Sequence, residues 1–322
     1  MKILAPLKNS AEVMPLLQAG ADEFYCGLTP PDWQQHCGQS WANRRGAVSA
    51  GIRDLADFQL AVAAAAEHPV YVALNAPWYP PGGVELLAEF GAQLLATGAA
   101  ALIVADMDLL LTLTAAGYAE KLHVSSLATC TNPAAAAFFR DLGVARVILP
   151  RHLTLEEIAA VGVDKLELEA FLLNDGCVFE EGLCATTHAA GTFCLEDGAD
   201  TTDLATETTE RYAFWKWTLN HCGCQTSQGY PLGPCGLCAL PRLLASGIHS
   251  FKVVGREASL PRKEKAVEIA ARALRIARSG GGPREIRQAV MNLRGADSLC
   301  EGSHLCYYPD VWRQKCPEEP RC

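Results

Sequence analysis

Cysteine is the residue type whose number and spacing in this sequence indicate chemistry most directly. The chain contains 14 cysteines, and half of them fall between Leu166 and Arg256, at Cys177, Cys184, Cys194, Cys222, Cys224, Cys235 and Cys238. Thiolates are soft ligands that suit iron–sulfur clusters and zinc. Cys177-x6-Cys184 and Cys235-x2-Cys238 supply four thiolates from two separate segments, so these are the candidate ligands. Cys194, Cys222 and Cys224 are alternates for the fourth position.

The spacing within these two pairs favours an iron–sulfur cluster over zinc. Structural zinc sites usually show a short C-x2-4-C spacing in both halves of the site. Cys235 and Cys238 have that spacing, whereas Cys177 and Cys184 do not. Zinc remains the alternative cofactor.

Cysteines outside these pairs have other predicted roles. Isolated thiols are most often small buried hydrophobic side chains, which is the interpretation for Cys26, Cys37 and Cys130. Cys26 and Cys37 nevertheless stand near a predicted strand end and could face the site. Further cysteines follow near the C-terminus, where a second site or closure of the first is the hypothesis for Cys300, Cys306 and Cys316, and Cys322 has no assigned role.

The overall composition indicates a folded chain with an acidic surface. The sequence has 322 residues, 50% of them hydrophobic, and a net charge of −9, which argues against a broad nucleic-acid-binding surface but leaves a local basic patch open. No run approaches the roughly 20 apolar residues of a spanning helix, and the opening residues MKILAPLKNSAEV do not resemble a signal peptide. We therefore expect a cytoplasmic protein, in which reducing conditions favour metal binding by clustered cysteines over disulfides.

Short apolar runs alternate with amphipathic helical patterns along most of the chain. This alternation predicts a parallel sheet with helical crossovers, and seven or eight such units in about 250 residues favour a closed (β/α) TIM-like barrel, regular or irregular. The predicted strands are Lys2–Ala5, Glu23–Cys26, Val70–Leu74, Ala101–Val104, Leu122–Val124, Arg146–Leu149, Lys165–Glu169 and Ser250–Val254. We expect the main part of the barrel in residues 1–175, a cysteine-rich insertion in 176–240, a closing helix-strand-helix in 241–282 and a cysteine-containing tail in 283–322.

Polar residues at the carboxyl ends of the strands predict a pocket, since barrel enzymes place their chemistry there. Ser125, Asn132, Arg151 and Glu169 are the candidates for binding a substrate, with Ser125, Arg151 and Glu169 as the predicted catalytic residues. Partial burial would raise the pKa of Glu169 and make it a proton acceptor. Arg151 and Arg256 would bind a carboxylate or phosphate bidentately. The alternative is that these residues form structural ion pairs, and that Asn75, Asp106 and Ser125 cap helices.

Four long segments resemble one known family in the same order. They are LAPLKNSAEVMPLLQAGADEFYCG, LHVSSLATCTNPAAAAFFRDLGVARVILPRHLTLEEI, LEAFLLNDGCVFEEGLC and LLASGIHSFKVVGRE. The sequence resembles the collagenase-like peptidases, peptidase family 32 of unknown type, over nearly its whole length. Three departures concern the cysteine segments. The family's His-Gly pair before the first cysteine is replaced by Asp175-Gly176, and its middle cysteine pair flanking a Pro and an Arg is replaced by Cys194 and Cys222-Gly-Cys224. Counting back from Gly247 places Cys235, not Cys238, on the family's last cysteine.

The resemblance implies a [4Fe–4S]-carrying protein that supports oxygen-independent hydroxylation of an RNA base or of a small aromatic molecule such as a quinone precursor. It also implies that the protein could act with a paired family subunit. The alternatives are a peptidase, for which Cys184 and His188 form a candidate dyad, and a non-catalytic metal-binding partner subunit. The sequence contains neither G-x-S-x-G nor H-E-x-x-H, so the common serine-hydrolase and zinc-peptidase motifs do not support the peptidase interpretation.

Overall fold

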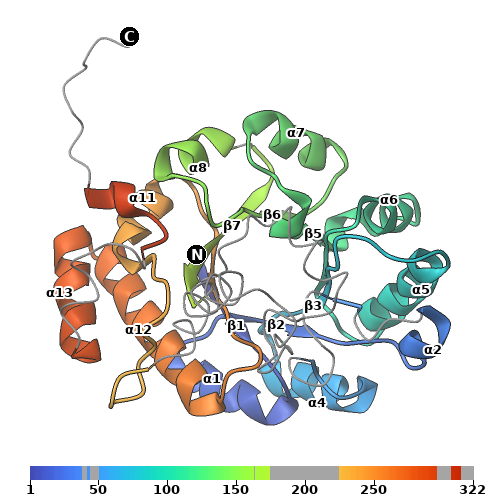
Figure 1. The fold of residues 1–322 in the computed structure, drawn as a ribbon, viewed down its shortest axis with the longest axis horizontal. Helices are drawn as coiled ribbons and strands as arrows, with labels where there is room; N and C mark the ends of the chain where they lie inside the picture. The colour runs from blue at the N-terminus through green and yellow to red at the C-terminus, as the bar shows by residue number, and fades with distance from the viewer. Residues whose placement is uncertain (38–41, 44–50, 163, 175–224, 296–305, 313–322) are drawn as a thin grey trace, which may run out of the picture.

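The strands form a closed parallel barrel in which each strand pairs with the next in the chain and β8 pairs with β1 (Figure 1). This computed structural model describes residues 1–37, 42–43, 51–162, 164–174, 225–295 and 306–312. The strands are β1 (Lys2–Pro6), β2 (Glu23–Gly27), β3 (Val70–Leu74), β4 (Ala101–Val104), β5 (Leu122–Val124), β6 (Arg146–Ile148), β7 (Glu167–Leu173) and β8 (Ser250–Val253). The predicted (β/α) barrel is confirmed.

Helices surround the ring of strands (Figure 1). They are α1 (Val13–Ala19), α2 (Trp33–Cys37), α4 (Leu55–Ala65), α5 (Gly83–Ala96), α6 (Met107–Ala115), α7 (Pro133–Asp141), α8 (Leu155–Val161), α11 (Leu240–Ala245), α12 (Leu260–Arg278) and α13 (Pro283–Arg294). Short 3-10 helices are η1 (Ser10–Glu12), η2 (Ala119–Lys121), η3 (Ser126–Ala128), η6 (Leu237–Ala239) and η8 (Pro309–Trp312). Across the described part of the chain, no helix is both long and apolar enough to cross a membrane.

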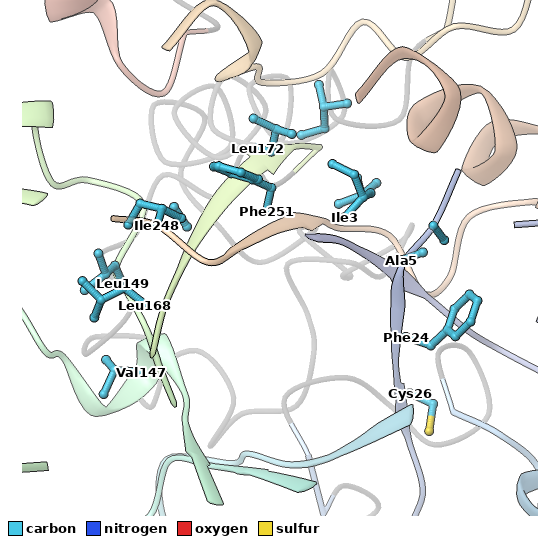
Figure 2. Close-up of a cluster of buried hydrophobic side chains, with 14 of the residues drawn as sticks. Ile3, Ala5, Phe24, Cys26, Val147, Leu149, Leu168, Leu172, Ile248 and Phe251 are labelled. Atoms are coloured by element: carbon cyan, nitrogen blue, oxygen red, sulfur yellow. The ribbon is translucent and has the colours of Figure 1, made fainter. Parts of the chain in front are cut away.

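Side chains on the strands alternate between two apolar layers, as the period of a β-strand requires. Residues such as Ile3, Phe24 and Phe251 lie on the outer side of the ring and pack against the surrounding helices (Figure 2). Their neighbours point into the barrel, where Leu4, Tyr25, Tyr71, Ile103 and Phe171 form a second cluster. The interior of the described barrel is therefore packed below its mouth.

Strand β7 differs from its prediction. We expected Lys165–Glu169, but the strand begins at Glu167 and continues to Leu173. The prediction treated the glutamates as the end of the apolar run. Glu169 instead points into the barrel, where Arg146 and Lys252 neutralise its charge, so the strand continues beyond it. The predicted position of Glu169 at a strand end is wrong.

Candidate functional site

The mouth of the barrel contains a pocket at the carboxyl ends of the strands. Its walls combine two aromatic rings, Tyr25 and Phe171, with the polar side chains of Asn75 and Ser125. Lys252 from β8 and the adjacent Arg256 and Glu257, which follow that strand, also line it. Aromatic walls with a few polar groups and charges of both signs suit a flat, polar ring.

Ser125 combines the two roles that the sequence suggested. Its hydroxyl accepts a hydrogen bond from Asn75 Nδ2 at 3.2 Å and from the backbone N–H of Leu127 at 3.4 Å, so it lines the pocket and also caps η3. Asp106 caps α6, as the alternative predicted. Asn132 is exposed and caps α7 by accepting from Ala135 N at 2.9 Å, and it does not line the pocket.

Arg256 and Lys252 bring positive charge to the mouth. Arg256 is buried and donates from Nη2 to Asn43 Oδ1 at 3.0 Å. It passes so close to Gly27 that a Cβ there would overlap the guanidinium, which explains a glycine at the end of β2. Lys252 lies 4.2 Å from the centre of the Tyr25 ring and 2.9 Å from Glu169 Oε1.

The structure places the other predicted residues elsewhere. Arg151 is buried just after β6 but does not line the mouth pocket. Glu169 is fully buried in the middle of β7, one inward position below Phe171, and it contacts the pocket through Lys252. Sequence reasoning missed Lys252 because a lysine within an apolar strand was treated as strand sequence only. The inward alternation of Ser250, Lys252 and Val254 was the signal that would have found it.

An ion-pair layer fills the barrel below this pocket. Arg146 Nη1 lies 2.8 Å from Glu23 and 3.1 Å from Glu169, while Nη2 lies 2.8 Å from Glu167. Burial alone would raise the pKa of Glu23, but the charge of Arg146 and hydrogen bonds from Arg146, Ser250 and Tyr71 hold it below its usual value. Burial would likewise lower the pKa of Arg146, yet the neighbouring carboxylates raise it. These groups neutralise one another and serve the packing of the barrel.

The loop that carries Cys235 is joined to the carboxyl end of β7. Cys235 forms an antiparallel bridge with Leu173. Gly236 N donates to Leu172 O at 2.8 Å, and Asn174 N donates to Pro234 O at 2.9 Å. Because the neighbouring Phe171 lines the mouth pocket, this loop lies at the same end of the barrel as the pocket.

Three thiols line a second cavity, which that loop shares with α13. Cys235, Cys238 and Cys306 share it with Arg287 and Arg294 from α13. The backbone of Cys306 forms a parallel β-bridge with that of Cys235, and Tyr307 N donates to Cys235 O at 3.1 Å. None of the cysteines in the described ranges forms a disulfide, and no group of three His, Cys, Asp or Glu side chains among those residues is arranged to bind a single metal ion.

The predicted cluster ligands are only partly within the described residues. Cys235 and Cys238 lie there, whereas Cys177, Cys184, Cys194, Cys222 and Cys224 lie outside them, as does His188. Cys26 faces the outer helices and not the mouth (Figure 2). Burial raises the pKa of Cys26 to about 12 and that of Cys130 to about 11, which agrees with the interpretation of both as buried apolar residues.

The comparison with family models decides the assignment. The model of peptidase family U32 matches residues 8–298. This protein belongs to peptidase family U32. A relative from Bacillus subtilis strain 168, tRNA hydroxylation protein P2, is 28% identical over 182 residues, which cover 56% of this chain and 54% of that protein. The U32 chain thus spans about half the length of that relative.

Solved structures resemble the chain only distantly. The U32 peptidase Mk0906 matches at a TM-score of 0.43 and 16% identity, covering 66% of this chain and 84% of its own. Dihydrodipicolinate synthase from Rhodopseudomonas palustris matches at 0.45 and 11%, covering 92% and 80%. Scores this low carry no argument about function, and the barrel assignment rests on the strand pairing itself.

Proposed function

We propose that this U32 protein carries a [4Fe–4S] cluster beside the barrel mouth and supports oxygen-independent hydroxylation, or a related modification, of a nucleobase or another aromatic substrate. Cys177, Cys184, Cys235 and Cys238 are the proposed ligands, and zinc is the alternative metal. One observation carries the proposal: the Cys235 loop is hydrogen-bonded to the end of β7, whose residue Phe171 lines the mouth pocket.

The residues around Cys235 fit a negatively charged, sulfur-rich group. The described side chains of that cavity include three thiols and two guanidinium groups but no carboxylate. Thiolates are soft ligands, and nearby N–H donors stabilise the sulfurs of a cluster. A cluster supplies one-electron chemistry when bound. Binding and orientation of the substrate would be performed by the protein's own side chains.

The mouth residues would bind and orient the substrate. Tyr25 and Phe171 offer ring surfaces for an aromatic substrate, and Asn75 and Ser125 offer hydrogen-bonding groups. Arg256 would hold a phosphate or carboxylate, because a guanidinium matches the geometry of these anions. Glu169 would act indirectly, by fixing the ammonium group of Lys252 at the floor of the pocket.

An RNA base is the substrate class that the comparison supports. The Bacillus subtilis relative is named for tRNA hydroxylation, and a flipped-out base would offer both a ring and an adjoining phosphate to the mouth. Because the match covers about half of that relative, the activity and substrate of this chain remain our proposal.

A peptidase activity is the competing function. A nucleophilic cysteine needs a thiolate, and the raised pKa values of Cys26 and Cys130 keep these two thiols protonated near neutral pH. Cys184 and His188 stay the candidate dyad. They would cleave a denatured protein without iron, which distinguishes this activity from the proposed one.

Anaerobic purification tests the cluster directly. We expect a brown protein with about four iron and four sulfide per chain, as the [4Fe–4S] composition requires. Cys235→Ala and Cys238→Ala should lose iron and colour, whereas Cys130→Ala, a buried thiol that does not line that cavity, should retain both. A wild-type protein that holds zinc and no sulfide would refute the cluster.

Arg256 tests the role of the barrel mouth. Arg256→Gln should lower base modification at least tenfold, since a charge-assisted hydrogen bond contributes about 1.5–3 kcal/mol, while the iron content stays unchanged. Mass spectrometry of nucleosides from tRNA incubated with the reconstituted protein measures the product. Arg140→Gln, an exposed residue on α7, is the control. Arg151→Ala in the same assay tests the role predicted for Arg151.

A further inference from the structure

Arg294, the last residue of α13, has a buried guanidinium with unsatisfied donors. Its side chain is 4% exposed, and its Nε and Nη2 atoms are buried without a hydrogen-bond partner. The residue lines the cavity that also contains Cys235 and Cys238. A buried cation with unpaired N–H groups costs several kcal/mol unless an anion compensates it.

The position of Arg294 is one that an apolar residue would normally occupy. Ile286, Val290 and Arg294 are the buried residues of α13 and follow one another at intervals of four, so they share one face of the helix. That face packs towards η6 and α12. The helix dipole favours a cation at the C-terminal end of α13. The dipole does not, however, provide hydrogen-bond acceptors for Arg294 Nε and Nη2.

No carboxylate lies among the described residues that line this cavity, so none of them balances the charge of Arg294. Arg287, two turns earlier on the same side of α13, adds a second cation, and its guanidinium lies 5.4 Å from the centre of the Trp312 ring. Besides the two guanidinium groups, the polar atoms of the described lining side chains are the sulfurs of Cys235, Cys238 and Cys306, the Tyr308 hydroxyl, which donates to Phe171 O, and the Trp312 indole N–H. Thiols are weak acceptors, whereas thiolates and cluster sulfides are anionic ones.

We propose that Arg294 donates its free N–H groups to the sulfurs of the cluster held at Cys235 and Cys238, and thereby favours the reduced cluster. This inference rests on the proposed function. A one-electron reduction makes the cluster more negative, so a fixed guanidinium stabilises the reduced state more than the oxidised state and raises the reduction potential. Arg294 is thus a positioning residue that acts through the cluster and does not touch the substrate.

The test measures the midpoint potential of the anaerobically purified holoprotein by spectroelectrochemical titration. Arg294→Met preserves much of the apolar stem and removes the charge and donors. We expect at least a tenfold lower ratio of reduced to oxidised cluster at a fixed potential, which equals a midpoint about 59 mV more negative for one electron. Arg294→Lys keeps the charge but lacks the planar guanidinium. Its midpoint potential should therefore lie between those of the wild type and Arg294→Met.

Arg287→Met is the matched control because it removes a guanidinium from the same helix and the same cavity. Its guanidinium lies against Trp312, so its midpoint should stay near that of the wild type. A folded Arg294→Met variant that cannot retain its cluster, while Arg287→Met does, would also support the assignment. Should Arg294→Met fail to fold, Arg294→Lys alone decides by its potential.

The outcomes separate this inference from the function on which it rests. A wild-type protein with iron and sulfide whose midpoint is unchanged in Arg294→Met and Arg294→Lys would overturn the role of Arg294 and leave the cluster in place. Equal shifts in the Arg294 and Arg287 variants would also overturn it, since they would show a general effect of charge. A wild-type protein without iron and sulfide would overturn both proposals.

Discussion

Two buried guanidinium groups, those of Arg146 and Arg294, have opposite surroundings. Arg146 is 2% exposed and lies within 3.1 Å of Glu23, Glu167 and Glu169. Arg294 is 4% exposed, and no carboxylate ion pair is found for it among the described residues. Both pay a similar cost of desolvation, but the protein itself compensates only the first.

The difference separates an arginine that the protein itself satisfies from one for which we propose an external ligand. The interior of the barrel satisfies Arg146 with residues from β2 and β7, so its charge needs nothing from outside. The cavity beside α13 offers thiols, whose charge depends on what they bind. Burial alone would not have distinguished the two arginines. The identity of their neighbours does.

The largest expected effect is on the satisfied side of this comparison. Arg146→Met should lower the free energy of unfolding by about 3–5 kcal/mol, because it leaves Glu23 buried without its nearest counter-ion and Glu169 with Lys252 alone. Urea unfolding at pH 7 measures it, with Arg140→Met on the surface as a control expected to change stability by less than about 0.5 kcal/mol. A small effect at Arg146 would show that the layer is not held by its charges.

Acidification should weaken the same layer in a known direction. The pKa of Glu23 lies below its usual 4.5, so its contribution to stability is present above pH 4.5 and is lost as the pH falls through the lower folded value. The charge of Arg146 cannot then be balanced as before. This loss should begin below pH 4.5, whereas the loss expected from His123 begins below pH 6.5.

His123 should produce an intermediate effect at milder pH. Burial and the charges of Arg146, Lys252 and Lys2 lower its pKa well below 6.5, so the folded protein keeps it neutral while the unfolded chain takes up a proton. Stability should therefore fall by up to about 1.4 kcal/mol per pH unit below pH 6.5. His123→Phe, which retains a ring against Tyr71, should remove that slope. Urea unfolding between pH 6.5 and 5 compares the two slopes, and equal slopes would contradict the assignment.

The smallest expected effect has the opposite sign. In the metal-free protein, Arg294→Met should increase the free energy of unfolding by about 1 kcal/mol, because it replaces an unpaired buried cation with an apolar side chain beside Val290. Urea unfolding after chelation measures it. A destabilisation comparable to that of Arg146→Met would show that Arg294 has a structural partner. The proposed difference between the two arginines would then be refuted.

Sequence patterns predicted most of the barrel because its strands are continuous apolar runs. Val70–Leu74, Ala101–Val104 and Leu122–Val124 have the predicted bounds. The prediction failed at β7 because Glu169 is neutralised by Arg146 and Lys252, which come from neighbouring strands 23 and 83 residues away. Local sequence cannot show such partners.

The candidate site was only partly predictable for the same reason. Ser125 and Arg256 were recognised from their positions after strands, and both line the mouth. Arg294 is far from the cysteine pairs in sequence, and only folding brings it to Cys235. The apolar spacing of Ile286 and Val290 was a usable signal, since it marks the third position as buried.

The contact between Tyr308 and β7 has a consequence for the order of assembly. The Tyr308 hydroxyl donates to Phe171 O at 3.0 Å across 137 residues of sequence, and its ring packs over Gly236, where a Cβ would meet it at 2.8 Å. A loop of that length closes late in folding, because its entropy cost precedes any gain from contact. During synthesis, Phe171 and Cys235 emerge from the ribosome well before Tyr308. The thiol cavity thus gains this wall after its other walls, and until then Cys235 and Cys238 stay more accessible than in the folded protein.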